Sequence, residues 1–445
     1  MKGFIQKIKD IWNHDELRHK IGYTLLLLLI YRVGSFIVLP GVDSAKLDAG
    51  AQGGLLGFLG LFTGGAFSRV SIFALGVMPY ISASIIIQLL GLAVPSIQKM
   101  QKEGESGRKK LNQWTRTLTI AIGLVQAPGY VAQYVPSNAH PAGSLWLVSA
   151  VIILTCSTLF VMWLGERITD KGIGNGTSLI IMTGIISDIP RGLFAEFAAQ
   201  TPFFFLIEMA TLVVIIGATI GIIQAVRRIP VQMARLSAGS AAGMPQGEAA
   251  RSFIPLRVNS AGVMPIIFAQ AIMFIPLYLQ NTESFRDNAV LASLTRIDGV
   301  GYNVLLFVTI ILFTFFYTAI VTNPTQIADD LKRNGNFVPG VKPGKDTAEF
   351  IDRVLSNITL PGGIFVGLIA ILPSILMMLG LAKAQQFAQF FGGTSLLITV
   401  GVMLDLLQQI ESHLLSRHYD GLMKSGRVRG RNTGGAAAVS TGYTV

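Results

Sequence analysis

Side chains that could carry bond chemistry are few in this sequence, and they lie outside its long apolar runs. A buried imidazole would serve as a base or metal ligand, but all five histidines flank those runs, at His14, His19, His140, His413 and His418. The single cysteine, Cys156, excludes an internal disulfide and a multi-cysteine metal site. No G-x-x-x-x-G-K-[ST] phosphate loop is present, so ATP hydrolysis has no evident site. We expect no enzymatic activity, no cofactor and no metal.

Charged residues are scarce within the apolar runs, and Arg32, Glu208 and Asp405 each lie near one end of such a run. A charge at the bilayer centre costs at least ~2.5 to 3.5 kcal/mol, and ion-coupled transporters keep buried acids for coupling. Snorkelling to the interface or local pairing explains these three charges better than a proton relay does. The sequence therefore favours a passive conduit.

The composition is typical of a protein that crosses a membrane many times. Hydrophobic residues make up 51% of the 445 residues and charged residues 13%, whereas a soluble domain carries about 25% charged residues. Several uncharged runs approach the ~20 residues that a spanning helix needs. We expect an all-α multi-spanning membrane protein with ten transmembrane helices. The predicted spans are 21–39, 69–93, 114–134, 145–165, 173–190, 203–226, 257–280, 302–323, 358–380 and 387–408.

The basic residues predict the orientation of these spans, because an even number of spans places both termini on one side. When residues at span ends are counted with the adjoining loop, 28 lysines and arginines lie on that side and six on the other, with Arg32 inside the first span. Basic residues are retained in the cytoplasm, so we expect both termini to be cytoplasmic. The first twenty residues are polar and basic, without an apparent cleavable signal.

Two predicted cytoplasmic loops, 227–256 and 324–357, are long and contain several basic residues. Membrane topology alone explains individual basic residues, but the length exceeds what a connection requires. We expect a cytoplasmic partner to dock on these loops. The net charge of +11 fits contact with anionic lipid headgroups or with ribosomal RNA phosphates and does not distinguish them.

Ten spans also divide into two groups of five, which would be related by inversion in the membrane. We expect a cytoplasmic segment 1–20, a first half 21–200, a second half 201–410 and a cytoplasmic tail 411–445. No convincing sequence identity joins the two halves, so this division is a hypothesis.

The segment LLGFLGLFTGGAF, residues 55–67, is apolar but too short to span. A helix of this length covers roughly 20 Å of the ~30 Å hydrocarbon core. Large apolar side chains are unfavourable in water, so we expect a short re-entrant helix that is buried against protein. The large residues are Leu55, Leu56, Phe58, Leu59, Leu61 and Phe62.

Span two carries an apolar stripe, because Val77, Ile81 and Ile85 recur at every fourth residue. Such a stripe commonly packs against a neighbouring helix or lipid. Ser82 is small enough to let another helix approach, and Gln88 carries an amide that is unfavourable in lipid. The pattern also fits a separable contact between two helices.

Two further spans carry residues that interrupt an apolar helix. Glycines surround Asn175 in the stretch KGIGNG at the start of span five. Asn259, Gly262 and Pro265 interrupt span seven. Irregular backbone at membrane depth is tolerated where protein covers it or where it lines a water-filled cavity. The two segments together predict a central cavity.

Six stretches of the sequence are distinctive when they are taken together: GGAFSRVSIFALGVMPYISASIIIQLL (64–90), QKEGESGRKK (101–110), WLGERITDKGIGNG (163–176), VNSAGVMPIIFA (258–269), FFYTAIVTNPTQIADDLKRNGNFVPG (315–340) and FGGTSLLITVGVMLD (391–405). They resemble the SecY family, the channel subunits of the bacterial protein translocon. The resemblance extends from the basic amino terminus to about residue 420. It implies a protein of the bacterial cytoplasmic (inner) membrane, an hourglass channel between two pseudo-symmetric halves, and a lateral gate between span two and spans seven and eight.

The resemblance implies a constriction made by a ring of apolar side chains, which excludes water by dewetting and flexes around a polypeptide. Thr177, one turn before a ring position, stands where the family usually has isoleucine. The matching ring positions are Val77, Ile81, Ile181, Ile267 and Ile398. The matching lateral-gate positions are Ser82, Ile85, Ile86, Gln88 and Asn259.

By the same resemblance, residues 55–67 form a plug that sits beneath the ring in the idle channel. The implied function is to translocate unfolded secretory polypeptides across the membrane and to release hydrophobic segments laterally into lipid. Two alternatives stay open. A ten-span secondary transporter of a small solute predicts buried charge or broken-helix dipoles at a binding site. A scaffold or receptor without a pore predicts no ion current after deletion of the plug.

The resemblance also implies partners: the small subunits SecE and SecG in a heterotrimer, the SecA ATPase, the ribosome with its nascent chains, and signal peptides. Lys342 stands where the family usually has arginine. Lysine keeps the charge but loses the planar fork that binds a carboxylate or phosphate with two hydrogen bonds. The implied docking residues are Arg227, Arg228, Arg235, Arg251, Lys342 and Lys345.

Overall fold

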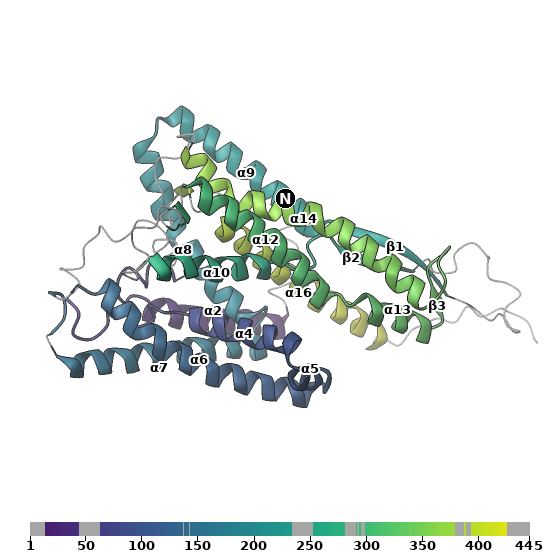
Figure 1. The fold of residues 1–445 in the computed structure, drawn as a ribbon, viewed down its shortest axis with the longest axis horizontal. Coiled ribbons are helices and arrows are strands. Elements are labelled where there is room, and N and C mark those ends of the chain that lie inside the picture. Colours follow the sequence, from purple (N-terminus) through teal and green to yellow (C-terminus); the bar gives the residue numbers. More distant parts are fainter. Residues whose placement is uncertain are drawn as a thin grey trace, which may run out of the picture.

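The computed structural model is a bundle of long helices with a small sheet at one end (Figure 1). It describes residues 14–43, 63–136, 138–141, 143–233, 252–280, 291, 293–294, 299–378, 387–388 and 393–424. The helices are α2 (Asp15–Gly34), α4 (Met78–Ala93), α5 (Pro95–Lys102), α6 (Glu105–Tyr134), α7 (Ser144–Lys171), α8 (Gly176–Ala199), α9 (Pro202–Gln224), α10 (Met264–Gln280), α12 (Val300–Val321), α13 (Pro324–Arg333), α14 (Lys345–Met378) and α16 (Gly393–Lys424). The strands are β1 (Val226–Met233), β2 (Ser252–Arg257) and β3 (Asn336–Phe337).

Each predicted span overlaps one long helix, and the prediction of a helical multi-spanning membrane protein is confirmed. Within the described ranges, six helices are long and apolar enough to cross a membrane. The bent pair of α4 and α5 would make a seventh span. The count of ten spans fits the ten long helices and stays a prediction.

Two predicted helix starts are wrong. Span two does not begin at residue 69, because residues 63–77 form consecutive turns and α4 begins at Met78. Glycines with positive φ, at Gly64, Gly65 and Gly76, interrupt a helix there. Span seven begins at Met264 rather than 257, since Asn259 and Gly262 lie in the turns 258–263.

The helices pack in two groups that meet along α16. α2, α4, α6, α7 and α8 form the first group, and α10, α12 and α14 lie together in the second (Figure 1). α16 packs against α8 and α9 on one side and α14 on the other. Aliphatic and aromatic side chains fill both groups, for example Leu154 with Tyr130 in the first and Ile310 with Met273 in the second.

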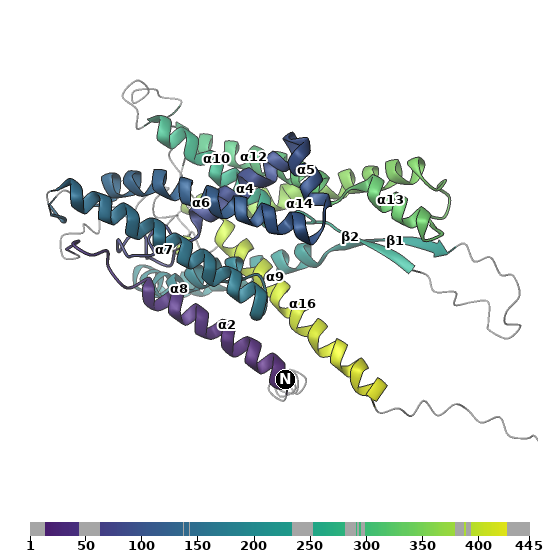
Figure 2. The same ribbon diagram turned by 90° about the horizontal axis from the view of Figure 1, so that it is seen from below.

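The sequence analysis missed a three-stranded antiparallel sheet in the order β2-β1-β3. Ile229 pairs with Ile254, and Gln232 pairs with Phe337. The sheet, α13 and the start of α14 share one hydrophobic core, whose buried members are Ile229, Leu256, Val338, Ile351 and Leu355. Parts of both predicted loops, 227–256 and 324–357, thus form one unit, here called the strand module. Figures 1 and 2 show this module extending from one end of the helices.

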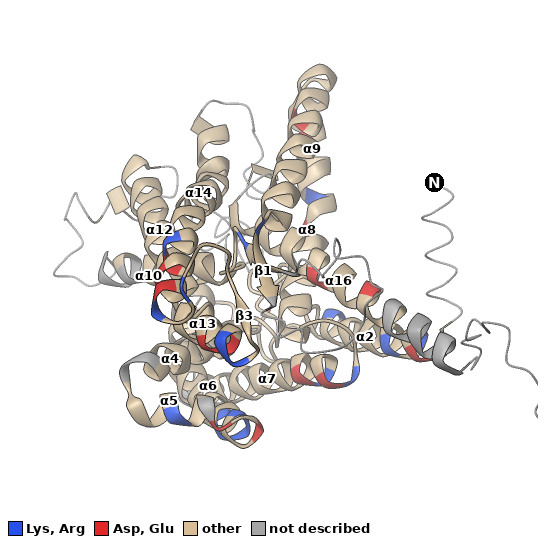
Figure 3. Ribbon diagram, turned by 90° about the vertical axis from the view of Figure 1, so that its right-hand side faces the viewer, with Lys and Arg blue, Asp and Glu red and all other residues tan. Residues whose placement is uncertain are grey.

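Charged residues are plentiful at the end of the molecule that carries the strand module. Figure 3 views this end and shows basic residues on α5, and both basic and acidic residues on α13 and at the ends of α6 and α7. The helix α9 carries few of them in the same view. This distribution agrees with a membrane-embedded bundle whose charged end lies outside the hydrocarbon core.

Candidate functional site

The centre of the molecule is an apolar cluster built by α2, α4, α7, α8 and α16. It contains Val77, Ile181 and Ile398, whose exposed fractions are 5%, 6% and 2%. The half-buried Ile81 packs against it, as does Val263 from the turn before α10. We call this set of residues the central cluster. Four of the five predicted ring residues therefore lie together, although Val77 comes from the turn before α4 and the others come from three different helices.

Ile267, the fifth predicted ring residue, is not a member of the central cluster. It is half-buried in the first turn of α10. Its neighbour Ile266 is buried among α10, α12 and α14, and Val263 packs against both groups of residues. The start of α10 therefore joins the central cluster to the second group of helices.

The chain reaches α4 through a buried turn segment, residues 63–77. Its residues Gly64, Ala66 and Phe67 are buried. Two backbone hydrogen bonds tie it to the chain after α2: Leu39 N–H donates to Val70 O (2.9 Å), and Ile72 N–H donates to Ile37 O (2.8 Å). This anchorage fixes where α4 begins, and hence the position of Val77.

The predicted plug falls mainly outside the described residues. Its six large residues, Leu55 to Phe62, belong to a range of which the structure says nothing. The end of the predicted plug, residues 63–67, is described and forms turns rather than helix. Gly64 and Gly65 have φ of +61° and +75°, which excludes a right-handed helix at these two positions.

The predicted lateral-gate residues lie on α4 and in the turn before α10. On α4, Ile85 is buried, Ser82 is half-buried and Ile86 is exposed. Gln88 Nε2 donates to Ser84 Oγ one turn earlier (3.2 Å), so its amide is bonded within its own helix. Asn259 is half-buried in the turns 258–263. The structure thus leaves the gate assignment as a prediction.

The motif WLGERITDKGIGNG forms the sharp connection between α7 and α8. Asn175 caps α8 by accepting from Ser178 N–H (3.3 Å). Thr169 Oγ1 accepts from Gly176 N–H (2.9 Å) and donates to Gly165 O (3.0 Å). A side chain at Gly176 would lie 2.0 Å from Gly165 O. These glycines therefore permit a close approach of α7 and α8. From the sequence alone, we had expected them to interrupt the helix.

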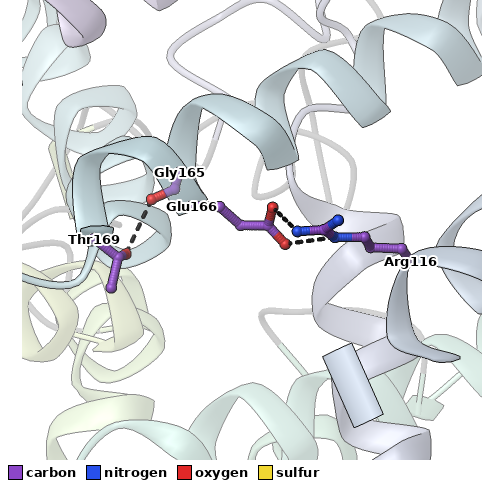
Figure 4. Close-up of polar contacts among 4 residues, drawn as sticks. All are labelled: Arg116, Gly165, Glu166 and Thr169. Atoms are coloured by element: carbon purple, nitrogen blue, oxygen red, sulfur yellow. Dashed lines mark hydrogen bonds and ion pairs between the residues drawn. The ribbon is translucent and has the colours of Figure 1, made fainter. Parts of the chain in front are cut away.

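An ion pair joins the same connection to α6, as Figure 4 shows. Arg116 donates from Nε to Glu166 Oε1 (3.0 Å) and from Nη2 to Glu166 Oε2 (2.6 Å). The sequence analysis missed this pair, because its members are 50 residues apart and no local pattern links them.

Two of the three charges within apolar runs have local partners, as predicted. Arg32 Nη1 donates to Gly64 O (3.0 Å). Glu208 is buried, and its Oε1 accepts from Gln200 Nε2 (3.1 Å). Asp405 is exposed on α16. These partners support a structural role for Arg32 and Glu208 rather than a relay of protons.

The predicted docking residues that the structure describes are all on the surface of the strand module. Arg227 and Arg228 are exposed on β1, and the Arg228 guanidinium lies 4.9 Å from the centre of the Phe253 ring. Lys342 and Lys345 are exposed beside the start of α14. Arg235 and Arg251 lie outside the described residues. Among the described residues, no group of three or more histidine, cysteine or acidic side chains is placed to hold a metal ion.

The fold resembles those of solved protein-conducting channels. It matches "The structure of a protein conducting channel" with a TM-score of 0.65 at 17% identity, over 91% of this chain and 94% of that chain. It also matches "Sec61 in the Canine ribosome-channel complex from the endoplasmic reticulum" with a TM-score of 0.61 at 16% identity, over 91% and 94% of the two chains. The architecture and the central cluster therefore define a multi-pass membrane protein with a translocation-channel fold.

Sequence comparison gives the family. The SecY family profile matches residues 71–407. The chain is 42% identical to "Protein translocase subunit SecY" of Thermus thermophilus, over 96% of this chain and 100% of that protein. It is 38% identical to the protein of the same name from Thermotoga maritima, over 96% and 99% of the two chains. The chain belongs to the SecY family.

Proposed function

We propose that this chain forms a protein-conducting channel that translocates unfolded secretory polypeptides and releases hydrophobic segments sideways into lipid. The observation that carries the proposal is the central cluster, in which Val77 from the turn before α4 meets Ile81, Ile181 and Ile398 from α4, α8 and α16. Apolar side chains from separate helices can part around a polypeptide, and they exclude water when nothing lies between them. Such a cluster binds no particular sequence, as a conduit for many substrates requires.

A secondary transporter is not favoured. A transporter site needs buried charge or helix ends directed at a solute, whereas the residues gathered at the centre of this chain are apolar. Arg32 and Glu208 are bonded to neighbouring protein atoms. Membership of the SecY family supports the same conclusion.

The finer assignments belong to this proposal. Val77, Ile81, Ile181, Ile267 and Ile398 form the ring, residues 55–67 form the plug, and Ser82, Ile85, Ile86, Gln88 and Asn259 belong to the lateral gate. Signal peptides enter between α4 and the helices α10 and α12, where hydrocarbon and channel are both accessible. The two halves, 21–200 and 201–410, part as units around the translocating chain.

The partners are assigned by family likeness and by the basic surface of the strand module. SecE and SecG complete a heterotrimer, and the SecA ATPase or the ribosome with its nascent chain docks on the module through Arg227, Arg228, Arg235, Arg251, Lys342 and Lys345. Anionic lipids and ribosomal RNA phosphates complement the same positive charge. We place the protein in the bacterial cytoplasmic membrane with both termini in the cytoplasm.

The test is site-specific crosslinking of a stalled secretory chain in the reconstituted complex. Cysteines are introduced singly at Ile81, Ile181, Ile267 and Ile398 after Cys156 is replaced by serine. Ile186, which is exposed on the same helix as Ile181, is the control position. We expect crosslinks from the ring positions and none from the control. Protection of the preprotein from external protease without crosslinks at the ring positions would refute the ring. Failure of the wild-type complex to protect any preprotein would refute the channel.

A further inference from the structure

Two arginines from different segments converge on one backbone oxygen. Arg32, in the last turn of α2, donates from Nη1 to Gly64 O at 3.0 Å. Arg69, in the turn segment 63–77, donates from Nη2 to the same oxygen at 2.8 Å. A carbonyl oxygen has two lone pairs, so these bonds occupy its full capacity. Hydrogen bonds from a charged donor are about twice as strong as neutral ones.

The surroundings hold both guanidinium groups in place. They lie over the Phe36 ring, 4.7 Å from its centroid for Arg32 and 4.6 Å for Arg69. Ser35 Oγ donates to the backbone oxygen of Arg32 (2.7 Å). Asp188 of α8 interacts electrostatically with both arginines and partly offsets their mutual repulsion. The arrangement therefore depends on α2, the turn segment and α8 together.

The contact requires glycine at position 64. Gly64 is buried with φ of +61°, and a side chain there would lie 2.7 Å from Arg32 Nη1 and 2.7 Å from Ser187 Oγ. Gly65 has φ of +75°, and a side chain on it would lie 3.1 Å from Arg69 Nη1. The GG pair before FSR is therefore the sequence signal for this contact, since only glycine fits both the backbone conformation and the space.

The contact lies near the start of the turn segment 63–77, which determines where α4 begins. Downstream of Gly64, Tyr130 Oη donates to Phe67 O (2.7 Å), and Val70 O accepts from Leu39 N–H (2.9 Å). Val77, which ends this segment, is buried in the central cluster. Upstream of Gly64 the chain leads into residues 55–62. A restraint on Gly64 therefore acts on the predicted plug, which precedes it in the chain, and on Val77 of the predicted ring, which follows it.

We propose that Arg32 and Arg69 are positioning residues that latch the channel shut by holding Gly64, and that opening the channel breaks this contact. This inference rests on the proposed channel function and adds the residues that set how readily the channel opens. Arg32 and Arg69 act through the backbone of Gly64 and need not touch the translocating polypeptide. Removal of either donor shifts the equilibrium toward the open state.

The test measures the resting ion conductance of the full complex in planar bilayers. We expect R32Q and R69Q each to raise it roughly tenfold, the change that the loss of one charge-assisted hydrogen bond produces in a two-state equilibrium. The double variant should raise the conductance further than either single variant, because the arginine that remains in a single variant still donates to Gly64 O. R32K should retain most of the closure, since lysine keeps the charge and one donor.

The control is R167Q, which removes the same charge from Arg167 on α7, where the guanidinium lies over the Trp163 ring. It should leave the resting conductance unchanged. The translocation rate of a preprotein with a strong signal reports folding, and it should be normal in every variant. Normal translocation with unchanged conductance in R32Q and R69Q would overturn the latch. So would a loss of translocation and thermal stability without a rise in conductance. Failure of the wild-type complex to translocate any preprotein would instead refute the channel itself.

Discussion

Arg116 and Glu166 form a two-point ion pair that joins α6 to the end of α7, with Nε–Oε1 and Nη2–Oε2 distances of 3.0 and 2.6 Å. The planar guanidinium group donates two hydrogen bonds to the carboxylate, so the pair fixes the relative orientation of the two groups as well as their distance. Glu166 lies beside Gly165, against which Gly176 packs at the start of α8. The helix that carries Ile181 is therefore positioned through a short chain of contacts that begins at Arg116.

Neutralising this pair should lower the thermal stability of the purified complex by a small amount. The Arg116 side chain is 51% exposed, so solvent screens the interaction, and E166Q should cost roughly 0.5 kcal/mol. R116E places two carboxylates together and should cost more, whereas the exchanged double variant R116E/E166R should recover most of the loss. D15N, which removes the exposed partner of Arg18 at the start of α2, is the control and should have no measurable effect. Equal melting temperatures for R116E and R116E/E166R would show that the pair contributes nothing.

Gly176→Ala should destabilise the protein much more than Gly217→Ala does. The added carbon would lie 2.0 Å from Gly165 O and 2.7 Å from Ile168 Cβ, so α7 and α8 would have to separate. Overpacking of this kind typically costs about 1 to 3 kcal/mol. Gly217→Ala on α9 meets nothing within 4 Å and should be neutral or slightly stabilising. Thermal unfolding in detergent compares the two variants, and similar melting temperatures would contradict the close approach.

Asparagine at Ile81 and Ile181 should hydrate the central cluster. A polar group buried without a partner costs roughly 1 to 3 kcal/mol, and water that relieves this cost would open a conducting path. We expect a rise of about tenfold or more in resting conductance, together with export of preproteins whose signals are weakened. I186N is the matched control on α8, because Ile186 is exposed and is not in the cluster. Unchanged conductance and unchanged signal selectivity in the double variant would count against the ring.

The helical periodicity and the long apolar runs predicted the ten helices, because each helix has to be apolar over most of its length whatever its neighbours are. The same reasoning failed where tertiary contacts decide the backbone. Residues 69–77 are as apolar as a span, yet Gly64, Gly65 and Gly76 with the bonds to Ile37 and Leu39 make them turns. The strand module was missed for a related reason, since β1 and β3 come from separate loops and pair only in the folded chain.

The ring residues in the central cluster were predicted partly from their spacing and partly from the family resemblance. Val77 and Ile81 were visible as a stripe from spacing alone, but no pattern within α8 or α16 singles out Ile181 or Ile398 among many apolar residues. Their grouping depends on how three helices approach, and the structure places them together. Arg69 lay within a quoted motif without an assigned role, because its partner is a backbone oxygen that carries no sequence signal.

Deletion of residues 55–62 should make the idle channel leak ions while preprotein translocation persists. The deletion leaves Thr63 and Gly64 in place, so the contacts of Arg32 and Arg69 are retained and only the large apolar side chains are lost. Conductance in planar bilayers measures the leak, and a second variant with the same segment replaced by alternating glycine and serine controls for chain length. A background conductance in both variants would mean that another element makes the seal.

Charge reversal at Lys342 and Lys345 should weaken binding of the motor ATPase or the ribosome to the strand module. Both side chains are exposed beside the start of α14, and Thr347 Oγ1 donates to Lys342 O (2.8 Å), which fixes the backbone that presents them. Surface charges act mainly through association rate and salt dependence, so K342E/K345E should lose about tenfold in affinity at low salt and less as ionic strength rises. The single variant K342E should lose part of this affinity, and K332E on α13, which makes the same charge change as K342E within the module, is its control. K342R should bind more tightly than the parent if the partner offers a carboxylate or phosphate that two parallel hydrogen bonds can grip. Equal losses for K332E and K342E would show that the module attracts its partner by net charge alone, without a defined contact at Lys342.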